Sequence, residues 1–455
     1  MKYFKISFLF ASLLLLGSCD NAIDVAPADE IVESNAITNV KDVGDAVIGV
    51  YSTVSNTSDL YWDALFTDEL TIAPQNNGQG IQVHTWSITS GEGNGIYGSH
   101  STTINRINRV LEAIEGITAD TPEEEALLQR YKGELLGLRA YSHFQMAVYY
   151  TPSMTDLNAL SVPYVDYVVV LQTPNRNTLG EVLAGINSDL DQAQSLIPDS
   201  FEEVYFFNAD AITALRSRIA LYTRDYAAAI NYSTQLINKY SLPTISEYPL
   251  VWTDDIVKGQ IFKLARVAGD GAVGQLFNPN PSLTYFNPST KLLEAYQADD
   301  VRKDVFFDAQ NRIVKYPGTA AVIGLNDLKI FRISEQYLIR MEAYLRQSSP
   351  NIAGAEADYN TLRRNRIPNY VDADFTTSAA AIPQVLEERY RELAYEGFRF
   401  IDLKRTARPV DRNDADCEDL AADACFLEAS SYLWALPIPQ SEIFVNDEMI
   451  QNPGY

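Results

Sequence analysis

The sequence contains few of the residues that most often bind metals or carry redox chemistry. Its 455 residues include three cysteines, three histidines and five methionines. The histidines, His84, His100 and His143, lie far apart in the sequence, and the patterns H-E-x-x-H, G-x-S-x-G and G-x-x-x-x-G-K-[ST] are all missing. We therefore expect no metal site and no cofactor, and the chain has no motif of a zinc protease, a serine hydrolase or a P-loop enzyme.

Positive charge is also scarce. The chain has 35 Lys and Arg residues against 60 Asp and Glu residues, which gives a formal net charge of -25. Nucleic acid and anionic membrane surfaces are excluded as natural partners, because each phosphate would be repelled by this excess of carboxylates. A neutral polymer such as an uncharged glycan would not be repelled.

No stretch reaches the roughly eighteen apolar residues that a membrane-spanning helix needs, but the N-terminus has the pattern of a leader. Lys2 and Lys5 precede a short apolar run that ends in the letters L-G-S-C, with the cysteine at Cys19. The pattern looks like a bacterial lipobox and predicts a signal peptide over residues 1–18, acylation of Cys19 and a tether over residues 19–38. The alternative is an ordinary signal peptide followed by an incidental cysteine.

The other two cysteines, Cys417 and Cys425, flank a short acidic stretch near the C-terminus. In an exported protein a disulfide between them is a reasonable expectation, since it would close only a small loop. Two free thiols are the alternative.

Helical spacing of apolar residues dominates residues 39–240. The last two segments form a pair rich in alanine and separated by Arg224-Asp225, which resembles the way tetratricopeptide units stack, although no strict 34-residue period is present. The expected helices lie near residues 43–51, 104–114, 127–141, 179–190, 209–222 and 226–238.

Two regions have a different composition. Residues 60–98 mix aromatic residues with Gly, Asn, Gln and Ser, and residues 241–333 are rich in Pro, Asn and Gly with β-prone runs at 260–267 and 311–316. Helical patterns return from residue 334. The sequence thus predicts a mainly α protein, with a tetratricopeptide-like helical scaffold and an irregular, loop-rich face that contains short β-hairpins.

The last 70 or so residues carry the most specific pattern. Residues 386–406 read LEERYRELAYEGFRFIDLKRT, in which Leu386, Tyr390 and Leu393 share one helix face and Gly397 ends the helix. The chain then ends in LPIPQSEIFVNDEMIQNPGY over residues 436–455. Together these blocks resemble the SusD/RagB family of surface nutrient-binding lipoproteins of the Bacteroidetes.

The resemblance implies an N-terminal SusD-like region at 39–240, an irregular region at 241–333 and a C-terminal SusD/RagB region at 334–455. It also implies the function of the chain. Such a protein binds an oligosaccharide or polysaccharide without catalysis, faces outward from the outer membrane, and delivers its ligand to a TonB-dependent, SusC-like transporter.

Two other functions stay open. Some family members serve peptide uptake, as the name RagB indicates, and a surface glycoside hydrolase would need only two carboxylates about 5 to 10 Å apart. With 60 acidic residues the sequence does not exclude such a pair. Glu388, Glu392 and Glu396 share a helix face, but a structural helix held by ion pairs explains them better than catalysis does.

Aromatic residues in polar loops are the best candidates for a sugar-binding platform, because a ring face can cover the apolar face of a sugar. The resemblance implies a site made by loops before the first tetratricopeptide helix, at about 60–98, and loops of the irregular region, at about 250–290. We expect Trp86, Tyr97, Trp252 and Tyr285 to form one platform. The full set of candidate ligand-binding residues is Trp62, Trp86, Asn94, Tyr97, Trp252, Tyr285 and Phe286.

Overall fold

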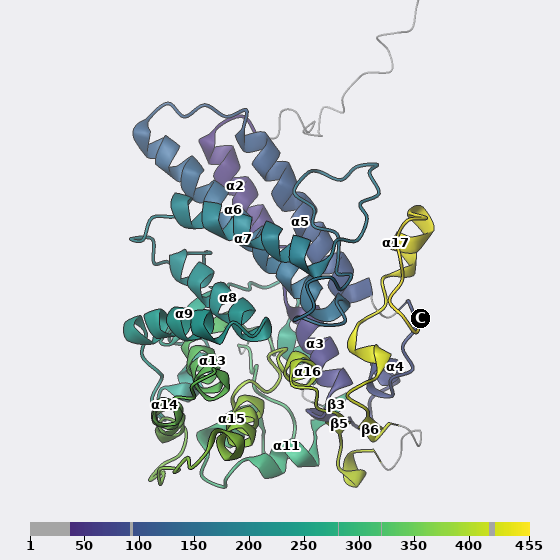
Figure 1. Ribbon diagram of the computed structural model, residues 1–455, viewed down its shortest axis with the longest axis vertical. Coiled ribbons are helices and arrows are strands. Elements are labelled where there is room, and N and C mark those ends of the chain that lie inside the picture. Colours follow the sequence, from purple (N-terminus) through teal and green to yellow (C-terminus); the bar gives the residue numbers. More distant parts are fainter. Residues whose placement is uncertain (1–36, 92–93, 281, 320, 418–423) are drawn as a thin grey trace, which may run out of the picture.

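The computed structural model describes residues 37–91, 94–280, 282–319, 321–417 and 424–455. The expected signal peptide, the acylated Cys19 and nearly all of the tether lie outside the described residues. The described chain is mainly helical, with a few short strands (Figure 1). Within this part of the chain, no helix is both long enough and apolar enough to span a bilayer.

Long helices form the upper half of the molecule in Figure 1. Their starts are set by the sequence: Asn39 caps the first, Thr121 caps the longest, and Thr178 with Glu181 forms a complete capping box at a third. Each packs on its neighbours along the chain. These helices are α2 (Val40–Tyr51), α5 (Asn94–Ile114), α6 (Pro122–Tyr150) and α7 (Leu179–Leu196).

Paired helices make up the lower half. The helices α8 (Ala209–Tyr222) and α9 (Tyr226–Lys239) are joined by a very short turn, so they lie antiparallel, and α13 (Ile333–Arg346) packs against α9. In turn α13 contacts α14 (Ile352–Arg364) and α15 (Ser378–Glu392). These stacked pairs confirm the mainly α fold class, and they are consistent with the predicted tetratricopeptide-like scaffold.

Short elements connect and cover this scaffold. The helices among them are α3 (Thr57–Phe66), α4 (Ile81–His84), α10 (Tyr248–Trp252), α11 (Thr290–Ala295), α12 (Val301–Phe306), α16 (Arg399–Arg405) and α17 (Gln440–Val445). Single 3-10 turns lie at Val273–Leu276, Asp414–Asp416 and Tyr432–Trp434. The strands are β1 (Leu70–Ile72), β2 (Gln260–Leu264), β3 (Phe286–Pro288), β4 (Leu328–Arg332), β5 (Val410–Asp411) and β6 (Phe426–Leu427).

The strands of the described residues pair as three two-stranded antiparallel sheets, β1 with β3, β2 with β4 and β5 with β6. The predicted strand at 260–267 therefore exists in part, as β2. The one predicted at 311–316 is wrong: Ile313 forms only an isolated bridge to Phe307. The bridge lies between the end of α12 at Phe306 and the turn at 308–311, so a longer ladder does not develop.

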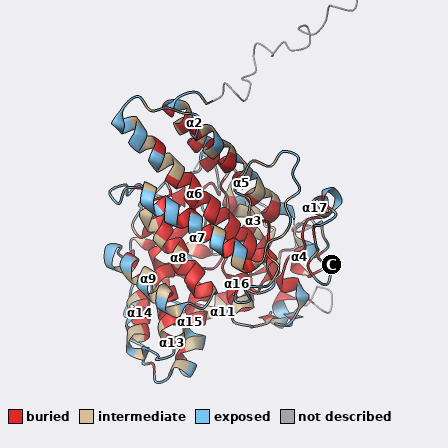
Figure 2. Cartoon of the chain, turned by 45° about the horizontal axis from the view of Figure 1, so that its top comes forward, coloured by how far each residue is buried: buried red, intermediate tan, exposed pale blue. Residues whose placement is uncertain are grey.

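Burial follows the inner faces of the helices, as Figure 2 shows, and one continuous apolar core links both halves. Near the C-terminus a disulfide joins Cys417 and Cys425, whose Cα atoms are 5.5 Å apart. The backbone N–H of Arg412 donates to the Cys425 oxygen, and the adjacent β5–β6 pair continues from there. The stretch at 418–423 between the two cysteines lies outside the described residues.

Candidate functional site

Strands β1 and β3 bring together the two loop regions that the sequence analysis singled out. Leu70 pairs with Pro288, and Ile72 pairs with Phe286, although more than 200 residues separate the strands in the sequence. The pairing continues past the strand ends, because the backbone N–H of Ala73 donates to the oxygen of Tyr285 at 3.1 Å. The loops that follow β1 and precede β3 thus start from one common point.

The loop after β1 is held in place by Asn76. The buried side-chain amide of Asn76 donates to the backbone oxygens of Tyr285, at 3.0 Å, and of Gln79, at 2.9 Å. Gly80 then turns the chain with φ of +65°, and a Cβ there would lie 2.7 Å from Leu65 and 3.2 Å from the Tyr61 hydroxyl. Only glycine fits this close approach without a shift of the neighbouring side chains.

Tyr61 and Tyr285 lie side by side at this point, each half-buried and half-exposed. Both rings rest against Phe286, with ring centroids 5.9 Å and 6.4 Å away from it, respectively. Burial, and then the neighbouring Tyr285 phenol, raises the pKa of Tyr61 to about 12. The Tyr61 hydroxyl is therefore neutral at physiological pH, and both tyrosine hydroxyls can serve as hydrogen-bonding groups on aromatic platforms.

Polar groups border the two rings. Ser58 lies one turn before Tyr61 on α3, so both side chains share a face of that helix. The N-terminus of α5 meets this face, since a Cβ at Gly95 would lie 3.8 Å from the Ser58 hydroxyl. The exposed Asn94 is the first residue of α5. We call the patch formed by Ser58, Tyr61, Gln79, Asn94 and Tyr285 the Tyr61–Tyr285 surface.

Of the seven candidate residues, only Asn94 and Tyr285 belong to this surface. The structure brings the two expected loop regions together, but the partner of Tyr285 is Tyr61, which sequence reasoning missed. Residues 57–66 form helix α3, not a loop, and Ser58 and Tyr61 are among its few residues that are only partly buried. Their spacing of three residues was the available signal, and it becomes informative only once the segment is recognised as a helix.

Four of the candidate rings are buried in the core and a fifth, Tyr97, is buried beside a cavity, so the expectation that they are exposed is wrong. Trp62 and Phe286 pack into the core, with at most 6% of their surface exposed. Trp86 donates its indole N–H to the Phe66 backbone oxygen at 2.9 Å, and the Arg412 guanidinium covers its ring. A ring covered on its face by a protein group offers no surface to a ligand.

Trp252 is the most deeply buried of the three candidate tryptophans. It ends α10, and Phe306 and Tyr316 pack their edges against it at 5.7 Å and 5.5 Å between ring centroids. The Lys315 ammonium lies 4.2 Å from its ring centroid. Trp252 is therefore a core residue beneath the irregular face, which its position in a polar segment did not reveal.

Tyr97 belongs to a different place. Its backbone N–H donates to the Tyr150 hydroxyl at 3.1 Å, and the two rings meet edge to face. Only 4% of its surface is exposed, and what remains lines a separate cavity beside α5. The expected four-ring platform is thus divided between one surface, one cavity and the core.

The three glutamates on α15 and just after it are held in buried ion pairs. The carboxylates of Glu388, Glu392 and Glu396 lie within 2.6 to 3.2 Å of basic side chains from α12, β4 and α14 or near them. These partners are Arg302, Lys315, Arg332, Arg363 and Arg366. Burial alone would raise the pKa of Glu388 and of Glu392, but the surrounding guanidinium groups hold both well below their usual range.

Protonated carboxyl groups do occur, but they are enclosed. Burial raises the pKa of Asp63 to about 8, although its carboxylate accepts hydrogen bonds from the backbone N–H groups of Arg399 and Phe400 and caps α16. Burial and the nearby Asp63 also raise the pKa of Glu69. Both side chains are almost completely covered, so a substrate would not reach them.

The histidines lie in the core as well. Burial lowers the pKa of His84 and of His143 to about 3, which keeps both neutral, and His100 contacts the Asp59 carboxylate. Across residues 37–455, excluding the short gaps in the description, no three His, Cys, Asp or Glu side chains cluster in a way that would hold a metal ion.

Comparison with known proteins shows which family has this architecture. A model described as the SusD family matches residues 315–455, and a second model, described as starch-binding and associating with the outer membrane, matches residues 25–221. The chain belongs to the SusD family. The SusD-family matches lie on both sides of the irregular region that supplies Tyr285.

Curated relatives match along their whole length. The SusD-like protein P2 of Formosa agariphila is 23% identical over the full length of both chains. A second protein of that organism, SusD-like protein P38, is 22% identical over 90% of this chain and 93% of its own.

Solved structures share the fold. A SusD superfamily protein of Bacteroides thetaiotaomicron matches with a TM-score of 0.81 and 24% identity, over 92% of this chain and all of that one. A surface glycan-binding protein A of Bacteroides fluxus matches with a TM-score of 0.73 and 18% identity, over the same shares of the two chains. At these identities the likeness defines the fold of this SusD-family protein.

Proposed function

We propose that this SusD-family protein binds a neutral oligosaccharide at the Tyr61–Tyr285 surface, does not alter it chemically, and delivers it to a TonB-dependent, SusC-like transporter in the outer membrane. The observation that carries the proposal is the pair of half-exposed tyrosine rings that β1 and β3 bring together in a chain of this family. The description of the matching family model as starch-binding, and the glycan-binding structural neighbour, support the ligand class.

The chemistry of the surface suits a sugar. Each exposed ring face can stack on the apolar face of one sugar unit, at about 0.5 to 1.5 kcal/mol per ring. The hydroxyl of Ser58 and the amides of Gln79 and Asn94 can exchange hydrogen bonds with sugar hydroxyls. No charged side chain belongs to this set, so the surface has no ionic group that would favour a charged ligand over a neutral one. Such a site binds weakly, in the micromolar to millimolar range, which suits a protein that must release its ligand.

The transporter and the membrane anchor are further parts of the proposal. The family model described as associating with the outer membrane supports that location. We expect a Cys19→Ala variant to appear in the soluble fraction and the wild type in the membrane fraction, exposed to protease on intact cells. A mild-detergent extract of the wild type should yield a TonB-dependent barrel with this protein, through an interface above about 1,000 Å².

Titration of the purified chain tests the ligand class. Calorimetry with neutral oligosaccharides, starting with maltoheptaose, is compared with short peptides of similar length, and the products are analysed after long incubation. The proposal requires saturable binding of at least one glycan with no new products. Binding of peptides alone would instead indicate a peptide-uptake protein, and glycan turnover would indicate a hydrolase.

A further inference from the structure

A cavity that shares no residue with the Tyr61–Tyr285 surface lies between α5, α6, the segment 163–174 and the C-terminal segment that contains α17. It encloses about 350 Å³, which is the size of a small-molecule site. Its lining is mostly apolar and includes Ile104, Met146, Pro163, Val165, Val445 and Met449. Tyr97, which the sequence analysis assigned to the sugar platform, lies in this wall.

Hydrogen bonds between side chains and backbone groups hold the segments that form the walls of this cavity. Asn446 donates its side-chain amide to the backbone oxygens of Thr173 and Pro174, both at 3.2 Å, which ties the C-terminal segment to the 163–174 segment. The His143 ring accepts from the Val165 N–H at 3.0 Å. These bonds connect the separate segments of the wall, so the cavity is a built feature of the fold.

Two polar side chains in the wall keep their hydrogen-bonding capacity. The half-buried carboxylate of Glu442 forms no ion pair and no side-chain hydrogen bond within the described residues, and burial is the cause that raises its pKa. The hydroxyl of the buried Tyr97 likewise has no hydrogen-bond partner in that part of the chain. After burial, the nearby Glu442 is the next cause that raises the pKa of Tyr97, and the Arg176 guanidinium lowers it, so both charged groups lie near the Tyr97 hydroxyl.

The mouth of the cavity is apolar and exposed. Val445, which lines the cavity, is 70% exposed, and the adjacent Phe444 is 77% exposed. On the facing segment, Val170 and Leu171 are exposed between the lining residues Val169 and Gln172. In Figures 1 and 2, α17 lies at the edge of the molecule with its outer side in solvent. A ligand entering here would meet apolar side chains first and a carboxylate within.

We propose that this cavity binds a small amphipathic amine, with its ammonium on the Glu442 carboxylate and the Tyr97 hydroxyl and its apolar body against Ile104 and Met146. An unpaired, partly buried carboxylate favours a cation, and the apolar lining favours a hydrocarbon body. The site is separate from the Tyr61–Tyr285 surface and does not depend on the glycan proposal.

Three probes of one size test the chemistry: hexylamine, hexanol and hexanoate, each titrated into the full mature chain and followed by calorimetry and saturation-transfer NMR. We expect hexylamine to bind at least tenfold more tightly than hexanol, and hexanoate to bind least. Equal binding of hexylamine and hexanol would overturn the proposal, because it would show a merely apolar hole. Failure of hexylamine to bind at concentrations that saturate ordinary weak sites would overturn it as well.

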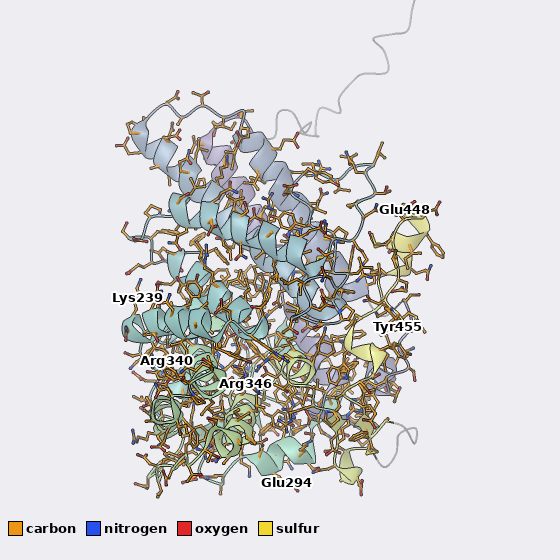
Figure 3. All side chains as sticks on the ribbon, viewed as in Figure 1. Lys239, Glu294, Arg340, Arg346, Glu448 and Tyr455 are labelled. Carbon is orange, nitrogen blue, oxygen red and sulfur yellow. A yellow bond between two sulfur atoms is a disulfide. The ribbon has the colours of Figure 1, made fainter. Side chains whose placement is uncertain are left out.

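Glu442→Gln removes the charge and keeps the shape. It should weaken hexylamine binding about tenfold or more and leave hexanol unchanged. The matched control is Glu448→Gln, since the exposed Glu448 lies in the same C-terminal segment, at the outer edge of the molecule (Figure 3), and does not line the cavity. Val445→Trp, at an exposed wall position, should block the mouth and abolish binding of hexylamine. Wild-type hexylamine affinity in both Glu442→Gln and Val445→Trp would contradict the site.

The amine could come from a free small molecule or from the end of a peptide. Trileucine with a free N-terminus and its N-acetylated form distinguish these sources. Binding of hexylamine and of free trileucine, but not of acetylated trileucine, would indicate that peptide ends are accepted. Binding of hexylamine alone would restrict the cavity to free amines. Glycan affinity should be equal in wild type and Glu442→Gln, which separates a failure of this site from a failure of the proposed function.

Discussion

The side-chain amide of Asn76 donates to the backbone oxygen of Tyr285 at 3.0 Å, across 209 residues of sequence. This bond connects the loop after β1 to the segment before β3, next to the bond between Ala73 and Tyr285. The ring of Tyr285 is therefore positioned by a distant loop as well as by its own strand. Its place beside Tyr61 depends on contacts that no local sequence window contains.

Replacing Asn76 should loosen the surface. In Asn76→Ala the Tyr285 oxygen keeps only the Ala73 donor and the loop loses the two hydrogen bonds of the buried Asn76 amide, so we expect about 1 to 3 kcal/mol of lost stability. Glycan affinity should fall severalfold. The neighbouring exposed Gln75→Ala is the control and should change neither quantity. Urea unfolding and calorimetric titration measure the two effects, and an Asn76→Ala variant with wild-type affinity would show that the loop does not position the ring.

Trp252→Ala should damage the fold and not the ligand surface. The ring is 1% exposed and packed between aromatic edges and cationic side chains. Removing a buried Trp costs about 3 to 5 kcal/mol. Urea unfolding should show this loss, whereas the exposed Val257→Ala in the same region should stay near wild type. If Trp252→Ala kept wild-type stability but lost glycan affinity, Trp252 would belong to the binding site and not to the core.

The disulfide between Cys417 and Cys425 should stabilise the C-terminal region. Closing so short a loop contributes about 2 to 3 kcal/mol by restricting the unfolded chain. The double variant Cys417→Ser with Cys425→Ser should therefore unfold at lower urea than wild type, and reductant should lower the wild type to the same midpoint. Equal midpoints for all samples would mean that the bond adds no stability.

Asp63 should give the protein a recognisable pH dependence. In the folded state the pKa of Asp63 is about 8, while its ordinary value is 3.8. Between these values the folded chain keeps a proton that the unfolded chain has released, so stability falls as pH rises from about 4 to about 8. Asp63→Asn imitates the protonated form, and its amide oxygen can still accept from the Phe400 N–H. The melting temperature of this variant should fall less steeply than that of wild type over this range.

The exposed Asp374→Asn serves as the control for this titration. Its melting temperatures should run parallel to those of wild type at every pH. If the Asp63→Asn curve also runs parallel to wild type, Asp63 does not hold its proton in the folded state. The claim that the carboxyl buried at the start of α16 is un-ionised would then be wrong.

The sequence predicted the scaffold well because helices are local. Apolar spacing and caps such as Asn39 and the Thr178–Glu181 box depend on neighbours a few residues away, and the main helices lie where expected. The C-terminal blocks were specific enough to indicate the family. Both kinds of signal are contained within one or two short segments.

The site was predicted only as a pair of regions. Polar composition around Trp86 and Trp252 suggested exposed loops, but burial is decided by distant groups, such as the Arg412 guanidinium over Trp86. Tyr61 was missed because it lies next to the buried Trp62, on the opposite face of a helix whose apolar pattern is weak. The β1–β3 pairing is what shows that Tyr285 lies beside Tyr61, and that pairing joins segments far apart in the sequence.

The central claim is that Tyr61 and Tyr285 together form a glycan platform, and calorimetric titration of their alanine variants tests it most directly. Wild type, Tyr61→Ala, Tyr285→Ala and the double variant are titrated with maltoheptaose and other neutral oligosaccharides, with Tyr205→Ala, at an exposed tyrosine outside the surface, as control. Each single variant should bind the best ligand about three- to tenfold more weakly, since a stacked ring contributes about 0.5 to 1.5 kcal/mol. The double variant should lose binding almost completely, while all melting temperatures stay close to wild type. Wild-type affinity in the double variant, or no glycan binding by the wild type at about 10 mM ligand, would contradict the account.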